Sequence, residues 1–142
     1  MAVIGETQGV HANVIQRLED ISQKLGKPVT IIKNGGKRHG PVDDSAHNSG
    51  IAADITIENM LSVAIADELV DAGFSGVGEY YRDAAGTQQT NTAHGDIRGL
   101  PGSENSGAYA PGGAKHSKRC WHRLAGTYNP GRKSGHRCPQ DG

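Results

Sequence analysis

The spacing of apolar residues changes along the first hundred positions, and this succession limits the folds open to the chain. Over residues 10–25 apolar side chains recur at steps of three and four, which is typical of an amphipathic helix. Gly26 and Pro28 end that helix. Residues 29–32 are short, β-branched and bounded by breakers, so they predict a buried strand before a polar loop at 34–50.

In the second half of this region a strand pattern precedes a helical pattern. Residues 53–57 alternate as a strand, and residues 60–72 return to helical spacing up to a Gly73 cap. Residues 76–81 and 93–97 predict two strands of an antiparallel hairpin. The expected fold class is therefore α+β, with two helices packed on a small, mainly antiparallel sheet.

Composition indicates one domain with a small core. The chain has 142 residues, of which 21 are glycine, and its hydrophobic share of 35% and mean hydropathy of −0.56 exclude a membrane protein. Its first residues show no signal peptide. We expect a core over residues 1–99 and an irregular, basic, glycine-rich extension over residues 100–142, packed on or trailing the same domain.

The charges are divided unevenly between these two parts. Residues 1–112 carry 8 basic and 14 acidic side chains, whereas residues 113–142 carry 7 and 1. A basic tail of this kind favours an anionic partner such as a wall polymer, and a solvated tail is the alternative. Nucleic acid is not the expected partner, because the tail offers only Trp121 and Tyr128 for stacking.

The two cysteines, Cys120 and Cys138, both lie in this extension. A disulfide between them would close a loop of about twenty residues and contribute around 3 kcal/mol in the chain-entropy model. Two alternatives stay open: free thiols in a reducing compartment, or a second zinc site with His122 and His136.

Three residues predict a metal site in the core. His47 and Asp54 stand seven residues apart at the end of the polar loop and the start of a strand, so a loop folding back would let them share one cation. His94 is the candidate third ligand, with Asp96 on the same strand face. Two imidazoles and one carboxylate leave a coordination position open, as in catalytic zinc sites. The alternative is that these residues cap turns and strands.

Two motifs in this order resemble a known family. They are S-x-H-x-x-G-x-A-x-D-I over residues 45–55, and G-V-G-x-Y over residues 76–80 followed by H-x-D-x-R-G over residues 94–99. The chain resembles, over residues 7–99, the zinc-dependent peptidoglycan peptidases with the hedgehog-like zinc peptidase fold. That family includes D-alanyl-D-alanine carboxypeptidases, murein endopeptidases and phage L-alanyl-D-glutamate endolysins.

The resemblance implies one catalytic zinc ion held by His47, Asp54 and His94 at the edge of the sheet. A zinc-bound water would attack an amide carbonyl that the ion polarises. The family also presents an arginine to the substrate's carboxylate or to the oxyanion, and Arg38 occupies that region. Ser45 is a second candidate for substrate binding. A solvated Lys37–Arg38 pair and a serine in a turn are the alternatives.

The general base departs from the family pattern. Many members carry an acid three residues before the last histidine ligand, where this chain has Asn91. Asp96 is the first choice of base, because it shares a strand face with His94, and Glu79 on the partner strand is the second. The alternatives are that Asp96 only orients a ligand histidine and that Glu79 is solvated.

The expected function is therefore that of a zinc metallopeptidase, a hydrolase of stem peptides or cross-links in peptidoglycan. It would act as a carboxypeptidase or an endopeptidase, with a phage endolysin among the possibilities. The alternative is a catalytically silent zinc-containing module of a cell wall or virion with the same fold. We expect a monomer that acts on the wall without a membrane partner, either released from the cytoplasm by lysis or exported by a route that the sequence does not reveal.

Overall fold

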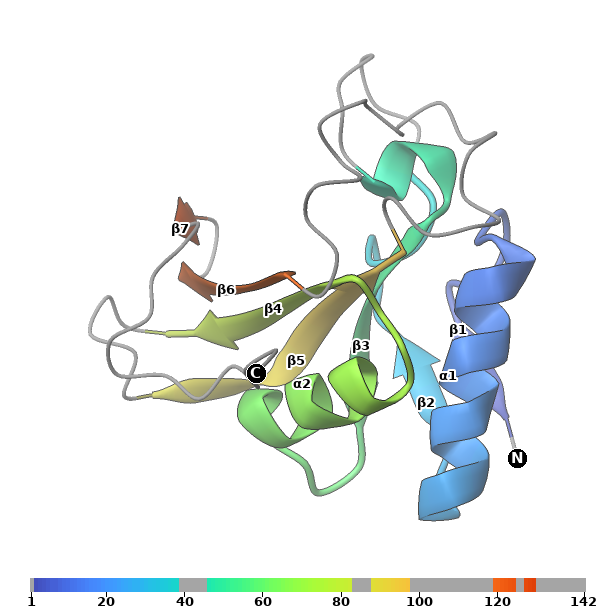
Figure 1. Ribbon diagram of the computed structural model, residues 1–142, viewed down its shortest axis with the longest axis horizontal. Helices are drawn as coiled ribbons and strands as arrows, with labels where there is room; N and C mark the ends of the chain where they lie inside the picture. The colour runs from blue at the N-terminus through green and yellow to red at the C-terminus, as the bar shows by residue number, and fades with distance from the viewer. Residues whose placement is uncertain (1, 39–45, 83–87, 98–118, 125–126, 130–142) are drawn as a thin grey trace.

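The computed structural model describes residues 2–38, 46–82, 88–97, 119–124 and 127–129. Figure 1 shows the elements along the chain. They are β1 (Val3–Gly5), α1 (Ala12–Leu25), β2 (Val29–Ile31), the 3-10 helix η1 (Ala46–Ser49), β3 (Ala52–Ile57), α2 (Ser62–Asp71), β4 (Gly76–Tyr81), β5 (Gln89–Asp96), β6 (Arg119–Leu124) and β7 (Thr127–Asn129).

The strands of the described residues form a single sheet in the order β1-β2-β3-β5-β4-β6-β7. Pairing is antiparallel between β2 and β3, β3 and β5, β4 and β5, and β6 and β7, and it is parallel between β1 and β2 and between β4 and β6. The expected antiparallel hairpin is present as β4 and β5. The sheet is thus mainly antiparallel, and the α+β fold class is confirmed.

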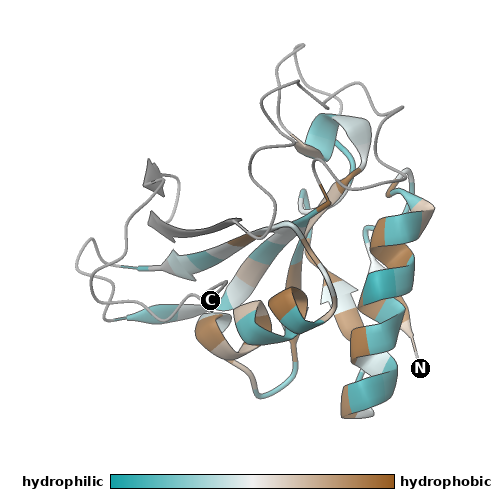
Figure 2. Cartoon of the chain, viewed as in Figure 1, coloured by the Kyte–Doolittle hydropathy of each residue, from teal (hydrophilic) through white to brown (hydrophobic). Residues whose placement is uncertain are grey.

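Both helices pack on one face of this sheet. The side chains that they bury join those of the central strands in one core cluster, whose members include Val14, Leu18, Ile21, Ile31, Ile55, Ile57, Ile65 and Leu69. A Cβ atom at Gly95 of β5 would lie 2.9 Å from both Leu69 Cδ2 and Phe74 Cδ1, so this strand packs tightly against α2. The bands of hydrophobic and hydrophilic residues on the helices in Figure 2 reflect this one-sided burial. Asp54, His94 and Asp96 project from the opposite face.

Local signals fix the bounds of α1. His11 caps its beginning, because the Nδ1 atom accepts a hydrogen bond of 3.0 Å from the backbone N–H of Asn13. Gly26 ends it with a φ of 69°, a left-handed conformation that favours glycine. The helix expected over residues 10–25 thus forms from Ala12, and the one expected over 60–72 forms over Ser62–Asp71.

Three strands were not expected from the sequence. β1 has only three residues, too few for a periodic signal, and it pairs in parallel with β2. β6 and β7 lie in the extension that was predicted to be irregular, so that prediction is wrong for these segments. β6 pairs with β4, from which it is separated by about forty residues, and local periodicity carries no information on such pairing. Cys120 lies in β6, whereas Cys138 is outside the described residues, so their disulfide stays a prediction.

No helix in the described part of the chain is long and apolar enough to cross a membrane.

Candidate metal centre

Two neighbouring strands and a 3-10 helix bring the three predicted ligands together. Asp54 of β3 lies directly opposite His94 of β5 in the antiparallel register, so their side chains project from the same face. His47 comes from η1, whose chain returns to the sheet through hydrogen bonds from Gly50 N to His47 O and from Ile51 N to Ala46 O. The expectation of a site at the edge of the sheet is wrong. β3 and β5 are interior strands, because the hairpin joins the sheet through β5.

The three side chains converge on one point. His47 Nε2 lies 3.2 Å from His94 Nδ1, and Asp54 Oδ1 lies 2.9 Å from His94 Nδ1 and 3.5 Å from His47 Nε2. All three residues are buried, with side chains 4–7% exposed. Two ligands about 2.0–2.1 Å from a tetrahedral zinc ion are separated by about 3.4 Å. The cluster therefore has donor types and spacings that fit a metal ion of this kind, and it could hold one.

The outer ring nitrogen of each histidine has a hydrogen-bond acceptor. His47 Nδ1 lies 3.0 Å from the backbone oxygen of Gly36, and His94 Nε2 lies 2.9 Å from Asp96 Oδ2. Proton donation through these outer nitrogens leaves the inner nitrogens, Nε2 of His47 and Nδ1 of His94, with lone pairs directed at the shared point. Metal-ligating histidines are oriented by such contacts to a carbonyl or a carboxylate. Residues that only cap turns do not require such contacts at the outer ring nitrogens.

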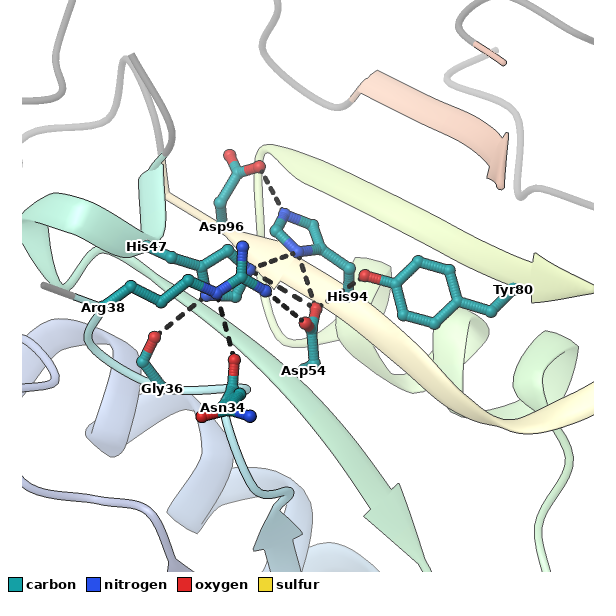
Figure 3. Close-up of polar contacts among 8 residues, drawn as sticks. All are labelled: Asn34, Gly36, Arg38, His47, Asp54, Tyr80, His94 and Asp96. Carbon is teal, nitrogen blue, oxygen red and sulfur yellow. Dashed lines mark hydrogen bonds and ion pairs between the residues drawn. The ribbon is translucent and has the colours of Figure 1, made fainter. Parts of the chain in front are cut away.

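Asp54 accepts hydrogen bonds at both of its oxygens. Arg38 Nη2 donates to Oδ2 at 3.2 Å, and the Tyr80 hydroxyl donates to Oδ1 at 2.7 Å. Figure 3 shows the two donors approaching the carboxylate from opposite sides. The Arg38 side chain is 40% exposed and is fixed by a second bond, from Nε to the backbone oxygen of Asn34 at 3.0 Å. Arg38 therefore lies at the rim of the cluster.

Burial and mutual contact shift the ionisation of all three residues. Burial alone would raise the pKa of Asp54, but hydrogen bonds from His47 and His94 hold that pKa far below its ordinary value. Burial also lowers the pKa of His47, and the hydrogen bond to Asp54 only partly offsets it. For His94, contacts with Asp54 and Asp96 outweigh burial and raise the pKa. In the metal-free cluster these shifts favour an ionised Asp54 and a neutral His47. Of the two histidines, His94 is the one that more readily carries a second proton.

A cleft near the ligand cluster has a lining of mixed polar and apolar surface. It is lined by Glu6, Gln8, Gly9, Asn34, Gly36 and Lys37. Gly36 contributes to both features, because its backbone oxygen contacts His47 and its chain forms part of the cleft wall. The cleft therefore lies on the outer side of His47, and none of the three ligands lines it.

The remaining predicted site residues fall into three groups. Arg38 reaches the cluster, where it binds Asp54. Asp96 is also there, but its carboxylate contacts the outer nitrogen of His94, on the far side of the imidazole from Asp54 (Figure 3). Glu79 is fully buried and pairs with Ala93, so strand alternation places it on the face opposite His94, towards the helices. Ser45 lies outside the described residues.

The positions of Asp96 and Glu79 bear on the predicted general base. Asp96 lies on the outer side of His94 and Glu79 on the opposite face of the sheet, so neither carboxylate faces the point that the three ligand atoms share. Asn91, which occupies the family's acid position, is exposed on β5. The geometry of Asp96 matches the alternative considered from the sequence, a residue that orients His94.

Sequence reasoning assigned no role to Tyr80 and Gly36. The sequence did contain a signal for Tyr80. Gly78 and Tyr80 are two residues apart in β4 and so lie on the same face, and Gly78 pairs with His94. Gly36 acts through its backbone oxygen, which no side-chain pattern reveals.

Comparisons of the chain with models of protein families, with curated proteins and with solved structures found no match.

Proposed function

We propose that the chain is a zinc-dependent hydrolase that cleaves an amide bond in the stem peptides or cross-links of peptidoglycan. The observation that carries the proposal is the convergence of His47 Nε2, Asp54 Oδ1 and His94 Nδ1, with the outer nitrogen of each histidine held by an acceptor. Three protein ligands with an open position are the ligand count of catalytic zinc sites. The choice of peptidoglycan as substrate comes from the resemblance of the two motifs.

Each residue of the cluster has a role in this proposal. A bound zinc ion would supply Lewis acidity towards a carbonyl oxygen and would lower the pKa of a water molecule. His47, Asp54 and His94 would hold the ion, and the ionised Asp54 would balance part of its charge. The exposed part of the Arg38 guanidinium keeps N–H groups free of Asp54 and Asn34 for an anionic substrate group.

A second candidate function is favoured by the placement of the carboxylates. Asp96 lies behind His94, Glu79 faces the helices, and Asn91 cannot accept a proton usefully. Among the described residues, the acids expected to serve as base thus do not face the open position. A zinc-containing module that binds the wall without cleaving it is consistent with this arrangement.

One experiment separates these functions. Purified chain is loaded with zinc, the metal is quantified, and the protein is incubated with purified peptidoglycan, whose soluble fragments are identified by mass spectrometry. The hydrolase should bind one zinc ion and release stem-peptide fragments, and His47→Ala should abolish both. Lys24→Ala, on the exposed surface of α1, is the matched control and should retain both.

The other outcomes are equally informative. A zinc-loaded protein that sediments with the wall and releases no fragments would support the silent module. A wild-type chain that binds no zinc would overturn both candidate functions.

A further inference from the structure

Tyr80 makes a short hydrogen bond to the ligand cluster. Its hydroxyl donates to Asp54 Oδ1 at 2.7 Å, and this oxygen is the one that contacts His94 Nδ1 and His47 Nε2. An ion held by the three ligands would bind that same oxygen. The phenol therefore acts on a ligand atom, although nothing in the sequence analysis gave it a function.

The backbone of Tyr80 is held in place on both sides. Its N–H donates to Ser62 Oγ at 2.8 Å, and its carbonyl oxygen accepts a hydrogen bond of 3.1 Å from Thr90 Oγ1. Ser62 is fully buried at the beginning of α2. Two residues earlier on the same strand face stands Gly78, which has no side chain of its own. These two hydrogen bonds fix the segment of β4 from which the Tyr80 ring extends to Asp54.

The two donors to Asp54 restrict how its carboxylate can bind an ion. Arg38 donates a hydrogen bond to Oδ2 and Tyr80 donates one to Oδ1, from opposite sides of the carboxylate (Figure 3). Rotation of the carboxylate to offer both oxygens to one ion would break these bonds. A ligand that uses one oxygen leaves more of the coordination sphere open, as hydrolysis at the ion requires.

We propose that Tyr80 is a positioning residue that acts through Asp54, keeping it a ligand through Oδ1 alone. This inference depends on the metal centre of the proposed function but not on its substrate. Tyr80→Phe removes the hydroxyl and keeps the ring. Loss of a hydrogen-bond partner of a ligand typically costs 10–100-fold in metal affinity, so zinc affinity should fall by about that factor.

The test measures the metal rather than the reaction. Zinc affinity of the full chain is determined by competition with a chromophoric chelator, and the visible absorption of the Co²⁺-loaded protein is recorded. Tyr80→Phe should weaken zinc binding and change the intensity and position of the Co²⁺ bands, because a carboxylate that rotates towards two-oxygen binding raises the coordination number. Such a spectral change is not expected from a general loss of stability.

The matched control is Ser22→Ala. It removes a buried hydrogen bond of 2.6 Å, from Ser22 Oγ to Lys27 O, at the far end of α1. Thermal unfolding of both variants shows how far each is destabilised, and Ser22→Ala should leave zinc affinity and the Co²⁺ spectrum unchanged.

The outcomes distinguish this inference from the proposed function. Zinc affinity and a Co²⁺ spectrum in Tyr80→Phe equal to those of the wild type would overturn the role of Tyr80 alone. A wild-type chain without zinc affinity would overturn the role of Tyr80 together with the proposed function. Zinc binding that depends on Tyr80 in a protein without hydrolytic activity would support this inference and overturn the hydrolase.

Discussion

At the scale of single residues, His94 is held from both sides by carboxylates. Its Nδ1 atom lies 2.9 Å from Asp54 Oδ1, and its Nε2 atom lies 2.9 Å from Asp96 Oδ2. A carboxylate behind a ligand imidazole fixes the tautomer and raises the basicity of the ligand nitrogen. Asp96 is thus placed to strengthen the metal site, although the sequence favoured it as the base.

Asp96→Asn separates these two roles. An orienting Asp96 predicts that zinc affinity falls by about 10–100-fold, because the neutral amide is a weaker acceptor for His94 Nε2–H. A base would instead leave zinc binding intact and reduce hydrolysis by about 10²–10⁴-fold. From the geometry we expect the loss of affinity, measured by chelator competition beside an assay of fragment release. Asp20→Asn on the exposed side of α1 serves as control, and unchanged affinity in Asp96→Asn would contradict the orienting role.

At the scale of elements, the sequence predicted what depends on local periodicity. The stripe of α1, the alternation of β3 and the strands of the β4–β5 hairpin were predicted correctly to within a few residues. Asp54 and His94 were expected to share one site, but the pairing of their strands was not predicted, because spacing along the chain does not determine which strands are neighbours. β6 was missed for that reason, and Gly36 was missed because its role belongs to a backbone oxygen.

The packing of β4 on β5 makes a further prediction at Gly76. A Cβ atom there would lie 2.5 Å from both carboxylate oxygens of Asp96, so the carboxylate must leave the position in which its Oδ2 atom contacts His94 Nε2. Because a side-chain end can shift at low cost, Gly76→Ala should lower zinc affinity by about 10–100-fold with little change in stability. The affinity is measured by chelator competition and the stability by thermal unfolding.

Gly26→Ala is the matched control for this change. A Cβ at Gly26 meets no atom within 4 Å, but the φ of 69° is unfavourable for alanine and costs about 1–2 kcal/mol of stability. It should therefore destabilise the protein and leave zinc affinity unchanged. Equal affinities of Gly76→Ala and the wild type would show that the position of Asp96 does not matter to the ion.

At the scale of the whole molecule, the core and the ligand cluster occupy opposite faces of one sheet. The helices bury their apolar side chains against one face, and Asp54 and His94 project from the other. The hydrophobic core is therefore complete without an ion, and we expect the metal-free chain to fold. A metal that binds only the folded state then adds stability by mass action.

The stability that a bound metal adds should depend on pH, because the metal and a proton compete for His94. The pKa of His94 is raised above 6.5 in the metal-free protein, so its proton stabilises the fold fully below that pH, and this contribution is lost as the pH rises through the raised pKa. Zinc must displace the same proton, so its apparent affinity falls by up to about tenfold per pH unit once His94 is protonated. Burial lowers the pKa of His47, so a proton on His47 competes with zinc less strongly than the proton on His94 does.

The stabilisation of the protein by zinc should consequently be larger at about pH 8 than at about pH 5.5. Zinc at about 100 times its dissociation constant adds about 2.7 kcal/mol, which for a chain of this size corresponds to roughly 5–15 °C in Tm. Thermal unfolding with and without zinc at both pH values measures the difference, and His47→Ala should show no increase at either. An increase in Tm that is the same at both pH values would mean that no proton leaves His94 when the ion binds, and the ligand assignment of its Nδ1 atom would then be wrong.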